Sequence, residues 1–146
     1  MKKILVPVDG SDASKKAALK AVEMAKKYDG SITFMYVASM PADMTRTRYG
    51  IVVPYDFGQI EKDLREEGRK FLDSFVAEVD SGGIRIDKIP TFGEPYEEIL
   101  RTAAEGNFEL IVMGRRGFSK IKRFFIGSVT QRVISDSPCP VYVVVE

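Results

Sequence analysis

The chain alternates between short apolar runs and longer segments with helical periodicity, and this alternation restricts the possible folds most. Such runs predict strands over residues 4–8, 32–37, 84–90, 110–113 and 141–145. Helical spacing predicts helices over residues 12–28, 57–80 and 129–134, and a further helix that begins at Pro95. Strands that alternate with helices form a parallel sheet covered on both faces. We therefore expect an open, doubly wound α/β sheet, flavodoxin-like or related, whose strand order the pattern leaves open.

The ends of the first predicted helix carry recognisable signals. Ser11 or Asp12 can cap its start, because their side-chain oxygens can accept hydrogen bonds from free N–H groups of the first turn. Gly30 is expected to stop it, because glycine readily adopts the left-handed conformation that ends many helices.

Composition favours one globular domain over residues 1–146. The chain is 45% hydrophobic and 29% charged, and its net charge of +1 gives no field that would favour nucleic acid or membrane surfaces. No apolar run approaches the ~20 residues needed to span a bilayer. The first run reaches Asp9 before a signal-peptide core of about 7–15 apolar residues has formed. We interpret it as a strand, and expect a cytoplasmic protein.

Several site classes are excluded by missing residues. The chain has no histidine and a single cysteine, so Ser-His-Asp triads, Cys-His pairs, histidine-ligated zinc and intrachain disulfides cannot form. Cys139 lies between Pro138 and Pro140, which favours a structural role. Neither a P-loop motif nor a Rossmann Gly-x-Gly-x-x-Gly motif after the first strand is present. Ser81-Gly82-Gly83 precedes a strand rather than following the first one, and we interpret it as a turn.

Glycines and hydroxyls after the fourth predicted strand indicate a phosphate site. Gly114 and Gly117 follow that strand, and Gly127-Ser128 opens the last predicted helix. Glycine allows close approach of the backbone to an anion and positive φ, and a helix N-terminus attracts negative charge. Ser128 and Thr130 add hydroxyl donors. The segment predicts a phosphate cradle at the carboxyl end of a strand.

The spacing Gly-x2-Gly-x9-Gly-Ser, followed by Val-Thr, resembles the ATP-binding class of universal stress proteins. Two further blocks, residues 3–11 and Ser137-Pro138-Cys139-Pro140-Val141, resemble the same family, so the likeness covers nearly the whole chain. The resemblance implies a Rossmann-like sheet of the adenine nucleotide alpha hydrolase-like type with strand order 3-2-1-4-5. It places the switch point between strands one and four, where ligands bind in open α/β sheets.

The resemblance also implies roles for individual residues. The ribose- and phosphate-facing set is Gly114, Gly117, Gly127, Ser128, Val129 and Thr130. Pro7 and Val8 would line the adenine pocket, Val37 would offer backbone groups to the adenine edge, and Met113 would pack against the base. Asp9 would bind the adenosine portion or help hold a divalent cation on the phosphates; its alternative role is a local turn or helix cap.

Two further segments have open interpretations. Five cations lie within the phosphate segment: Arg115, Arg116, Lys120, Lys122 and Arg123. One or two of them can neutralise a triphosphate, and Arg115 and Arg116 are both candidates, although a solvated face is the usual role of a charge run. The long irregular stretch 38–56 is equally consistent with a lid, a flexible excursion or a partner contact.

The last predicted strand, Val141 to Val145, is apolar and ends near a charged Glu146. If it lies at a sheet edge it can pair with a second copy, and a dimer formed in this way is the family's common arrangement. Protection of the edge by Glu146 is the alternative.

These observations lead to one leading hypothesis and two alternatives. The first is an ATP-binding, dimeric regulator in stress response, with Mg²⁺ or Mn²⁺ on the phosphates and at most slow hydrolysis or autophosphorylation. The second is an adenylating enzyme that cleaves ATP to AMP and pyrophosphate. The third is an interaction module without nucleotide affinity. The sequence leaves open the protein partner and whether ATP, ADP or AMP is preferred.

Overall fold

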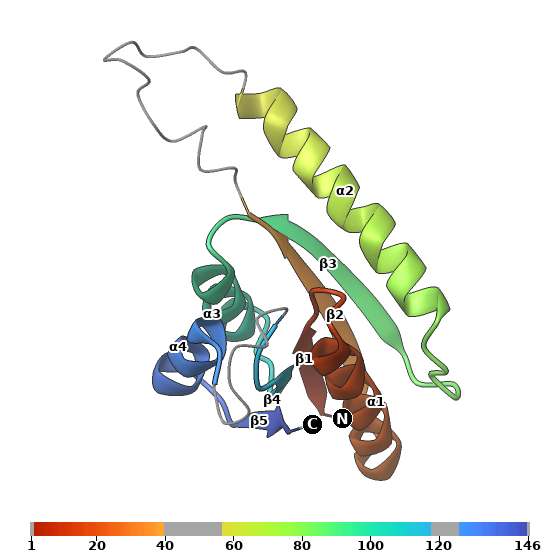
Figure 1. The fold of residues 1–146 in the computed structure, drawn as a ribbon. Coiled ribbons are helices and arrows are strands. Elements are labelled where there is room, and N and C mark those ends of the chain that lie inside the picture. Colours follow the sequence, from red (N-terminus) through yellow and green to blue (C-terminus); the bar gives the residue numbers. More distant parts are fainter. Residues whose placement is uncertain (1, 40–56, 118–125, 146) are drawn as a thin grey trace.

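The computed structural model describes residues 2–39, 57–117 and 126–145. Strands and helices alternate along the chain (Figure 1). The strands are β1 (Lys3–Pro7), β2 (Ser31–Ala38), β3 (Ile86–Phe92), β4 (Leu110–Gly114) and β5 (Val141–Val144). The helices are α1 (Asp12–Tyr28), α2 (Phe57–Ala77), α3 (Pro95–Glu105) and α4 (Ser128–Asp136).

The five strands form one parallel sheet in the order β3-β2-β1-β4-β5, which confirms the order implied by the resemblance. β1 is central and pairs with β2 on one side and with β4 on the other. The chain thus winds outward from β1 in both directions. The switch point lies between β1 and β4, as expected.

Two apolar cores lie on opposite faces of the sheet, because successive side chains of a strand alternate between its faces. Ile4 and Val6 pack with α1 and α2 on one face, whereas Leu5 packs with α3 and α4 on the other. Figure 1 shows the same two helical layers. Burial of β1 on both faces explains its continuous apolar run. No helix in the described part of the chain has the length and apolar character needed to cross a membrane.

The start of α1 confirms the cap expected from the sequence, whereas its end differs from the expectation. Ser11 is the N-cap, and its hydroxyl accepts a 3.2 Å hydrogen bond from the N–H of Ser14. At the other end Asp29, not Gly30, adopts the left-handed conformation, with φ of 52°. Gly30 is required for a different reason, since a Cβ there would lie 2.9 Å from the carbonyl oxygen of Lys2.

The boundary between α2 and β3 also differs from the prediction. α2 ends at Ala77 rather than at Asp80, and the N–H groups of Glu78 and Val79 bond the carbonyls three residues earlier, as in a tightened last turn. β3 begins at Ile86 rather than at Ile84. The Ser81-Gly82-Gly83 segment is a turn, as predicted, with positive φ at both glycines.

The two edges of the sheet are chemically different. Along β3, Lys88 pairs with Asp73 of α2 at 2.7 Å, and Pro90 removes one backbone donor. β5, at the opposite edge, has the sequence Val-Tyr-Val-Val. Tyr142 is 39% exposed, and Val145 beyond the strand is 66% exposed. The edge position assumed for the last strand is therefore confirmed.

Candidate functional site

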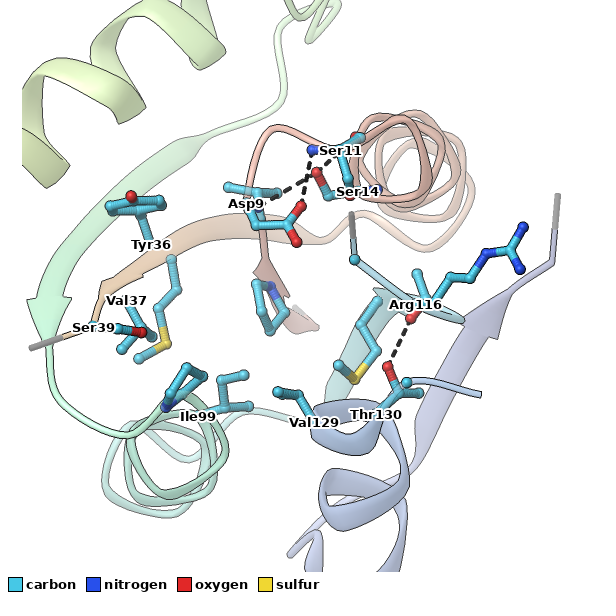
Figure 2. A pocket seen from close by; sticks show the side chains of 18 of the residues that line it. Asp9, Ser11, Ser14, Tyr36, Val37, Ser39, Ile99, Arg116, Val129 and Thr130 are labelled. Atoms are coloured by element: carbon cyan, nitrogen blue, oxygen red, sulfur yellow. Dashed lines mark hydrogen bonds between the residues drawn. The ribbon is translucent and has the colours of Figure 1, made fainter. Parts of the chain in front are cut away.

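A cavity of about 650 Å³ lies where β1, β2 and β4 end, beside the switch point of the sheet. This volume is within the usual range of small-molecule sites, about 300–1,000 Å³. Helices from both layers contribute to its walls, so the cavity crosses the carboxyl edge of the sheet (Figure 2). Its lining residues are Pro7, Val8, Asp9, Ser11, Ser14, Met35, Tyr36, Val37, Ala38, Ser39, Glu67, Pro95, Ile99, Met113, Gly114, Arg116, Gly117, Gly127, Ser128, Val129 and Thr130.

The lining brings together every predicted site residue except Arg115. Arg115 continues the β4 ladder, because its N–H bonds the carbonyl of Val144 at 3.2 Å. Arg116, the next residue, lines the cavity instead. In Figure 2 its guanidinium points away from the cavity centre. The other three cations of the predicted run, Lys120, Lys122 and Arg123, lie outside the described residues, as does 40–56 of the irregular stretch.

Asp9 occupies the tight turn between β1 and α1. Its Oδ1 accepts a 2.9 Å hydrogen bond from the N–H of Ser11, and its own N–H faces the hydroxyl of Ser14 at 3.4 Å. Gly10, with φ of 84°, makes this turn possible. The local turn role considered for Asp9 is therefore real. The side chain is exposed and lines the cavity, so that role leaves it available to a ligand.

The start of α4 presents free backbone donors to the cavity. Gly127 is its N-cap, and as a glycine it has no side chain to cap the first turn. The N–H of Gly127 is fixed by a 2.8 Å bond to the carbonyl of Arg115. The N–H groups of Ser128, Val129 and Thr130 have no partner within the helix, because the first turn lacks preceding carbonyls. The positive end of the α4 dipole thus faces the cavity.

Close packing, rather than backbone conformation, explains the motif glycines. None of Gly114, Gly117 and Gly127 has a φ in the left-handed range, which corrects the expectation of positive φ. A Cβ on Gly114 would lie 2.7 Å from the Cβ of Ala13, so this glycine lets α1 approach β4. A Cβ on Gly127 would lie 3.2 Å from the Cα of Arg116.

Val37 directs backbone groups into the cavity. The carbonyl of Met35 accepts a 2.8 Å bond from the N–H of Val8, so the polar backbone groups of Met35 face β1. Val37, two residues later, faces the same way. The pairing of β1 with β2 ends at Pro7 and Met35. The N–H and carbonyl of Val37 therefore face the cavity with no strand partner in the described part of the chain.

One side of the cavity is apolar and another carries a phenol. Met35, Ile99 and Met113 belong to the core on the α3–α4 face and also line the cavity. Tyr36 lies on the α2 side, with its ring 4.4 Å from that of Phe71. Burial raises the pKa of the Tyr36 phenol, and the carboxylates of Glu67 and Asp9 raise it further. Tyr36 is therefore a neutral hydrogen-bonding group at physiological pH.

The sequence model of the universal stress protein family matches residues 1–145. The chain belongs to this family. Universal stress protein YxiE of Bacillus subtilis is 38% identical over 144 residues, covering 97% of each chain. MJ0531 of Methanocaldococcus jannaschii is 34% identical over 143 residues, covering 98% of this chain and 81% of its own. The solved structure of MJ0577, from the same organism, superposes with a TM-score of 0.80 at 26% identity, covering 99% and 96% of the two chains.

Some lining residues of this universal stress protein were missed from sequence. Tyr36 and Ser39 could have been found from their place beside Val37, since Tyr36 lies near the carboxyl end of β2 and Ser39 directly follows it. Ser14 could have been found as the polar residue one turn into α1. Glu67 and Ile99 gave no signal, because only the packing of α2 and α3 brings them to the strand ends.

A second groove, of about 540 Å³, adjoins the first. It lies between the starts of α3 and α4 and shares Ser128 and Val129 with the main cavity. The Arg132 guanidinium lies 4.4 Å from the centre of the Tyr96 ring and is thereby held at the groove. Glu94 and Glu97 complete the lining. Over the described residues, no group of three or more acidic or cysteine side chains could hold a metal ion.

Proposed function

We propose that this universal stress protein binds ATP in the cavity at the carboxyl edge of its sheet and acts as a nucleotide-responsive regulator in stress response. The observation that carries the proposal is the uncapped start of α4 beside an otherwise largely apolar cavity. Free backbone N–H groups and a positive dipole end are suited to phosphate oxygens. The apolar walls are suited to a nucleobase.

In this proposal adenine lies against the apolar walls. Pro7, Val8 and Met113 contact the base, and the N–H and carbonyl of Val37 bond its polar edge. A backbone donor and acceptor side by side match an adenine edge, which offers an exocyclic amine and a ring nitrogen. The support is the orientation of Val37, whose polar backbone groups face the cavity beyond the last β1–β2 pair.

The ribose and phosphates extend toward α4 in the same proposal. Gly114, Gly117 and Gly127 line this part of the cavity, while Ser128, Val129 and Thr130 supply N–H groups. Asp9 would be a candidate protein ligand for Mg²⁺ or Mn²⁺, and such a cation would neutralise part of the phosphate charge. The described residues offer no dedicated metal cluster, so most of the cation's ligands would be phosphate oxygens and water.

Two structural relatives are consistent with an adenine nucleotide. One universal stress protein was solved in complex with cAMP, and one from Arabidopsis thaliana was solved with AMP bound. They are 22% and 18% identical to this chain, so they share its fold only. The proposal therefore depends on the chain's own cavity.

Turnover in this proposal is slow at most. Asp9 and Glu67 are the carboxylates among the described cavity residues, and Oδ1 of Asp9 already accepts the Ser11 N–H. A general base must reach the attacking water in the right geometry. We therefore expect slow hydrolysis or autophosphorylation, and signalling through nucleotide occupancy.

We also propose that two copies pair along β5. The strand is an edge strand, and its exposed Tyr142 and neighbouring Val145 are apolar. Pairing of identical strands about a twofold axis would satisfy the outward backbone groups of both.

The direct test is calorimetric titration of ATP, with Mg²⁺ present, into purified protein stripped of bound nucleotide. Mass spectrometry of the untreated protein first identifies any ligand that co-purifies. We expect about one ATP per chain, and parallel titrations with ADP and AMP rank the three ligands. The absence of binding to folded protein would overturn the proposal.

A second candidate function is adenylation of an acceptor, with cleavage of ATP to AMP and pyrophosphate. The second groove supports it, because this groove adjoins the proposed phosphate site at Ser128 and Val129 and could hold an acceptor. Release of pyrophosphate with candidate acceptors would favour this function. Release of orthophosphate alone, or no turnover, would count against it.

A further inference from the structure

Gly117 lies beside the Asp9 carboxylate, with space for a hydrogen but not for a side chain between them. A Cβ built on Gly117 would lie 2.5 Å from Oδ2 of Asp9 and 3.8 Å from its Cγ. No other described atom, apart from the neighbouring residues in the chain, lies within 4 Å of that Cβ. The missing side chain at position 117 therefore makes room for one group, the carboxylate of Asp9.

The other oxygen of this carboxylate is already fixed. Oδ1 accepts the 2.9 Å hydrogen bond from the N–H of Ser11, as drawn in Figure 2. The carboxylate thus lies between the turn that begins α1 and the segment that follows β4. Because Oδ1 is held by this bond, a new group near Oδ2 would either turn the carboxylate away, at the expense of the Ser11 hydrogen bond, or shift the backbone at position 117.

We infer that Gly117 is a positioning residue that acts through Asp9, by leaving the space that keeps the Asp9 carboxylate in the cavity. Gly117 then contributes to ligand binding through Asp9 rather than through a phosphate contact of its own. This inference rests on the proposed nucleotide site for its effect on binding. The steric coupling between the two residues does not depend on any ligand.

A double-mutant cycle tests the coupling, with wild type, Gly117→Ala, Asp9→Ala and the double variant. We expect Gly117→Ala to weaken ATP binding about tenfold, which corresponds to about 1.4 kcal/mol. In the Asp9→Ala background the same change should have almost no effect, because its clash partner is gone. Equal losses from Gly117→Ala in both backgrounds would overturn the inference.

The Asp9→Asn variant distinguishes a steric effect of the side chain at position 9 from an effect of its charge. Asparagine keeps an oxygen for the Ser11 N–H and places an amide nitrogen where Oδ2 lies, so the clash with a Cβ at position 117 remains. Gly117→Ala should therefore still be harmful in the Asp9→Asn background. Loss of the effect with asparagine as well as with alanine would contradict a steric origin.

The ligand profile distinguishes positioning from general disruption. We expect Gly117→Ala to reproduce the pattern of Asp9→Ala across ATP with Mg²⁺, ATP without Mg²⁺ and adenosine. If Gly117→Ala weakens binding under a condition in which Asp9→Ala does not, Gly117 has a direct role in binding. That result would overturn the inference.

Urea unfolding of the same variants gives a measurement that is independent of the proposed function. The destabilisation caused by Gly117→Ala should be smaller in the Asp9→Ala background than in wild type. If wild-type protein binds no ATP, the proposed function fails, yet the unfolding cycle still decides the coupling. An unchanged destabilisation in both backgrounds would show that residue 117 does not act through Asp9.

Discussion

The hydroxyl of Thr130 donates a 3.0 Å hydrogen bond to the carbonyl oxygen of Gly114, and both residues are buried. The bond joins the first turn of α4 to the last residue of β4, at the phosphate-facing side of the proposed site. The bond uses the hydroxyl proton of Thr130, which corrects the expectation that this hydroxyl donates to phosphate, and the backbone N–H is the remaining donor of this residue.

Thr130→Val should destabilise the fold by about 1 kcal/mol, because it removes the hydroxyl donor and the buried carbonyl of Gly114 loses this hydrogen bond. Urea unfolding measures the change. Thr130→Ser is the matched control, since it keeps the hydroxyl and should retain most of the stability. Equal stability of the valine variant and wild type would show that the bond contributes nothing.

Gly114→Ala should destabilise the protein by about 1–3 kcal/mol, the usual cost of overfilling a packed site. The added Cβ would lie 2.7 Å from the Cβ of Ala13 and 2.9 Å from its carbonyl carbon. Chemical denaturation of both single variants and of Gly114→Ala with Ala13→Gly measures the interaction. Removing the Ala13 methyl should relieve only part of the strain, because the backbone contact remains.

Gly127→Val should abolish ATP binding in a protein that still folds. The branched side chain adds bulk where even a Cβ lies 3.2 Å from the Cα of Arg116, and it covers the free N–H groups of α4. Calorimetric titration measures the loss, and circular dichroism checks the fold. Gly127→Ala is the control, with a smaller loss. Full ATP affinity in a folded valine variant would contradict the proposed phosphate site.

Asp73→Asn should reduce the dependence of stability on acid pH. The Lys88 ammonium, which donates a 2.7 Å hydrogen bond to Asp73, lowers the pKa of this carboxyl, and Arg69 lowers it further. Because the pKa of Asp73 is lower in the folded state, its ionised carboxylate stabilises the fold at pH values above the unfolded-state pKa of about 3.9. This stabilisation is lost as the pH falls through the folded-state pKa.

The urea midpoints of wild type and Asp73→Asn should thus differ near neutral pH and converge at about pH 2. The difference should be small and sensitive to salt, because the group is exposed. Glu78→Gln is the control, because Glu78 lies just beyond the end of the same helix and forms no ion pair with another described residue. A constant difference at every pH would exclude the ionic contribution.

Val143→Pro should prevent dimer formation while leaving the subunit folded. The carbonyls of Pro140 and Val144 accept bonds from β4, so the N–H of Val143, which faces the opposite way, points outward. Proline removes that N–H and protects the edge. Light scattering after size exclusion measures the mass, and Val143→Thr is the control. An unchanged dimer would place the interface elsewhere.

The fold was largely predictable because its signals are local. Continuous apolar runs, such as the one that begins at Ile4, indicated buried parallel strands, and the family resemblance supplied their order. The end of α1 was mistaken because glycine is the usual left-handed residue, whereas Asp29 adopts that conformation here. The end of α2 was extended too far because Val79 continues the apolar spacing after the helix has stopped.

The site was predictable where it lies on strand ends and the start of α4, since motif and topology both point there. Glu67 and Ile99 could not be predicted, because their place depends on how α2 and α3 pack. The reason for Gly117 was equally hidden. It depends on contact with Asp9, more than a hundred positions earlier in the printed sequence.

The contrast between the two sheet edges has a consequence for the proposed pairing of two copies. At β3, ion pairs and Pro90 discourage an incoming strand, whereas no strand in the described part of the chain pairs with the outer side of β5. A subunit with one open edge can accept one neighbour, and pairing of like edges uses up both. Growth into a filament would require two open edges on each subunit. If two copies pair along β5 as proposed, assembly would therefore stop at two.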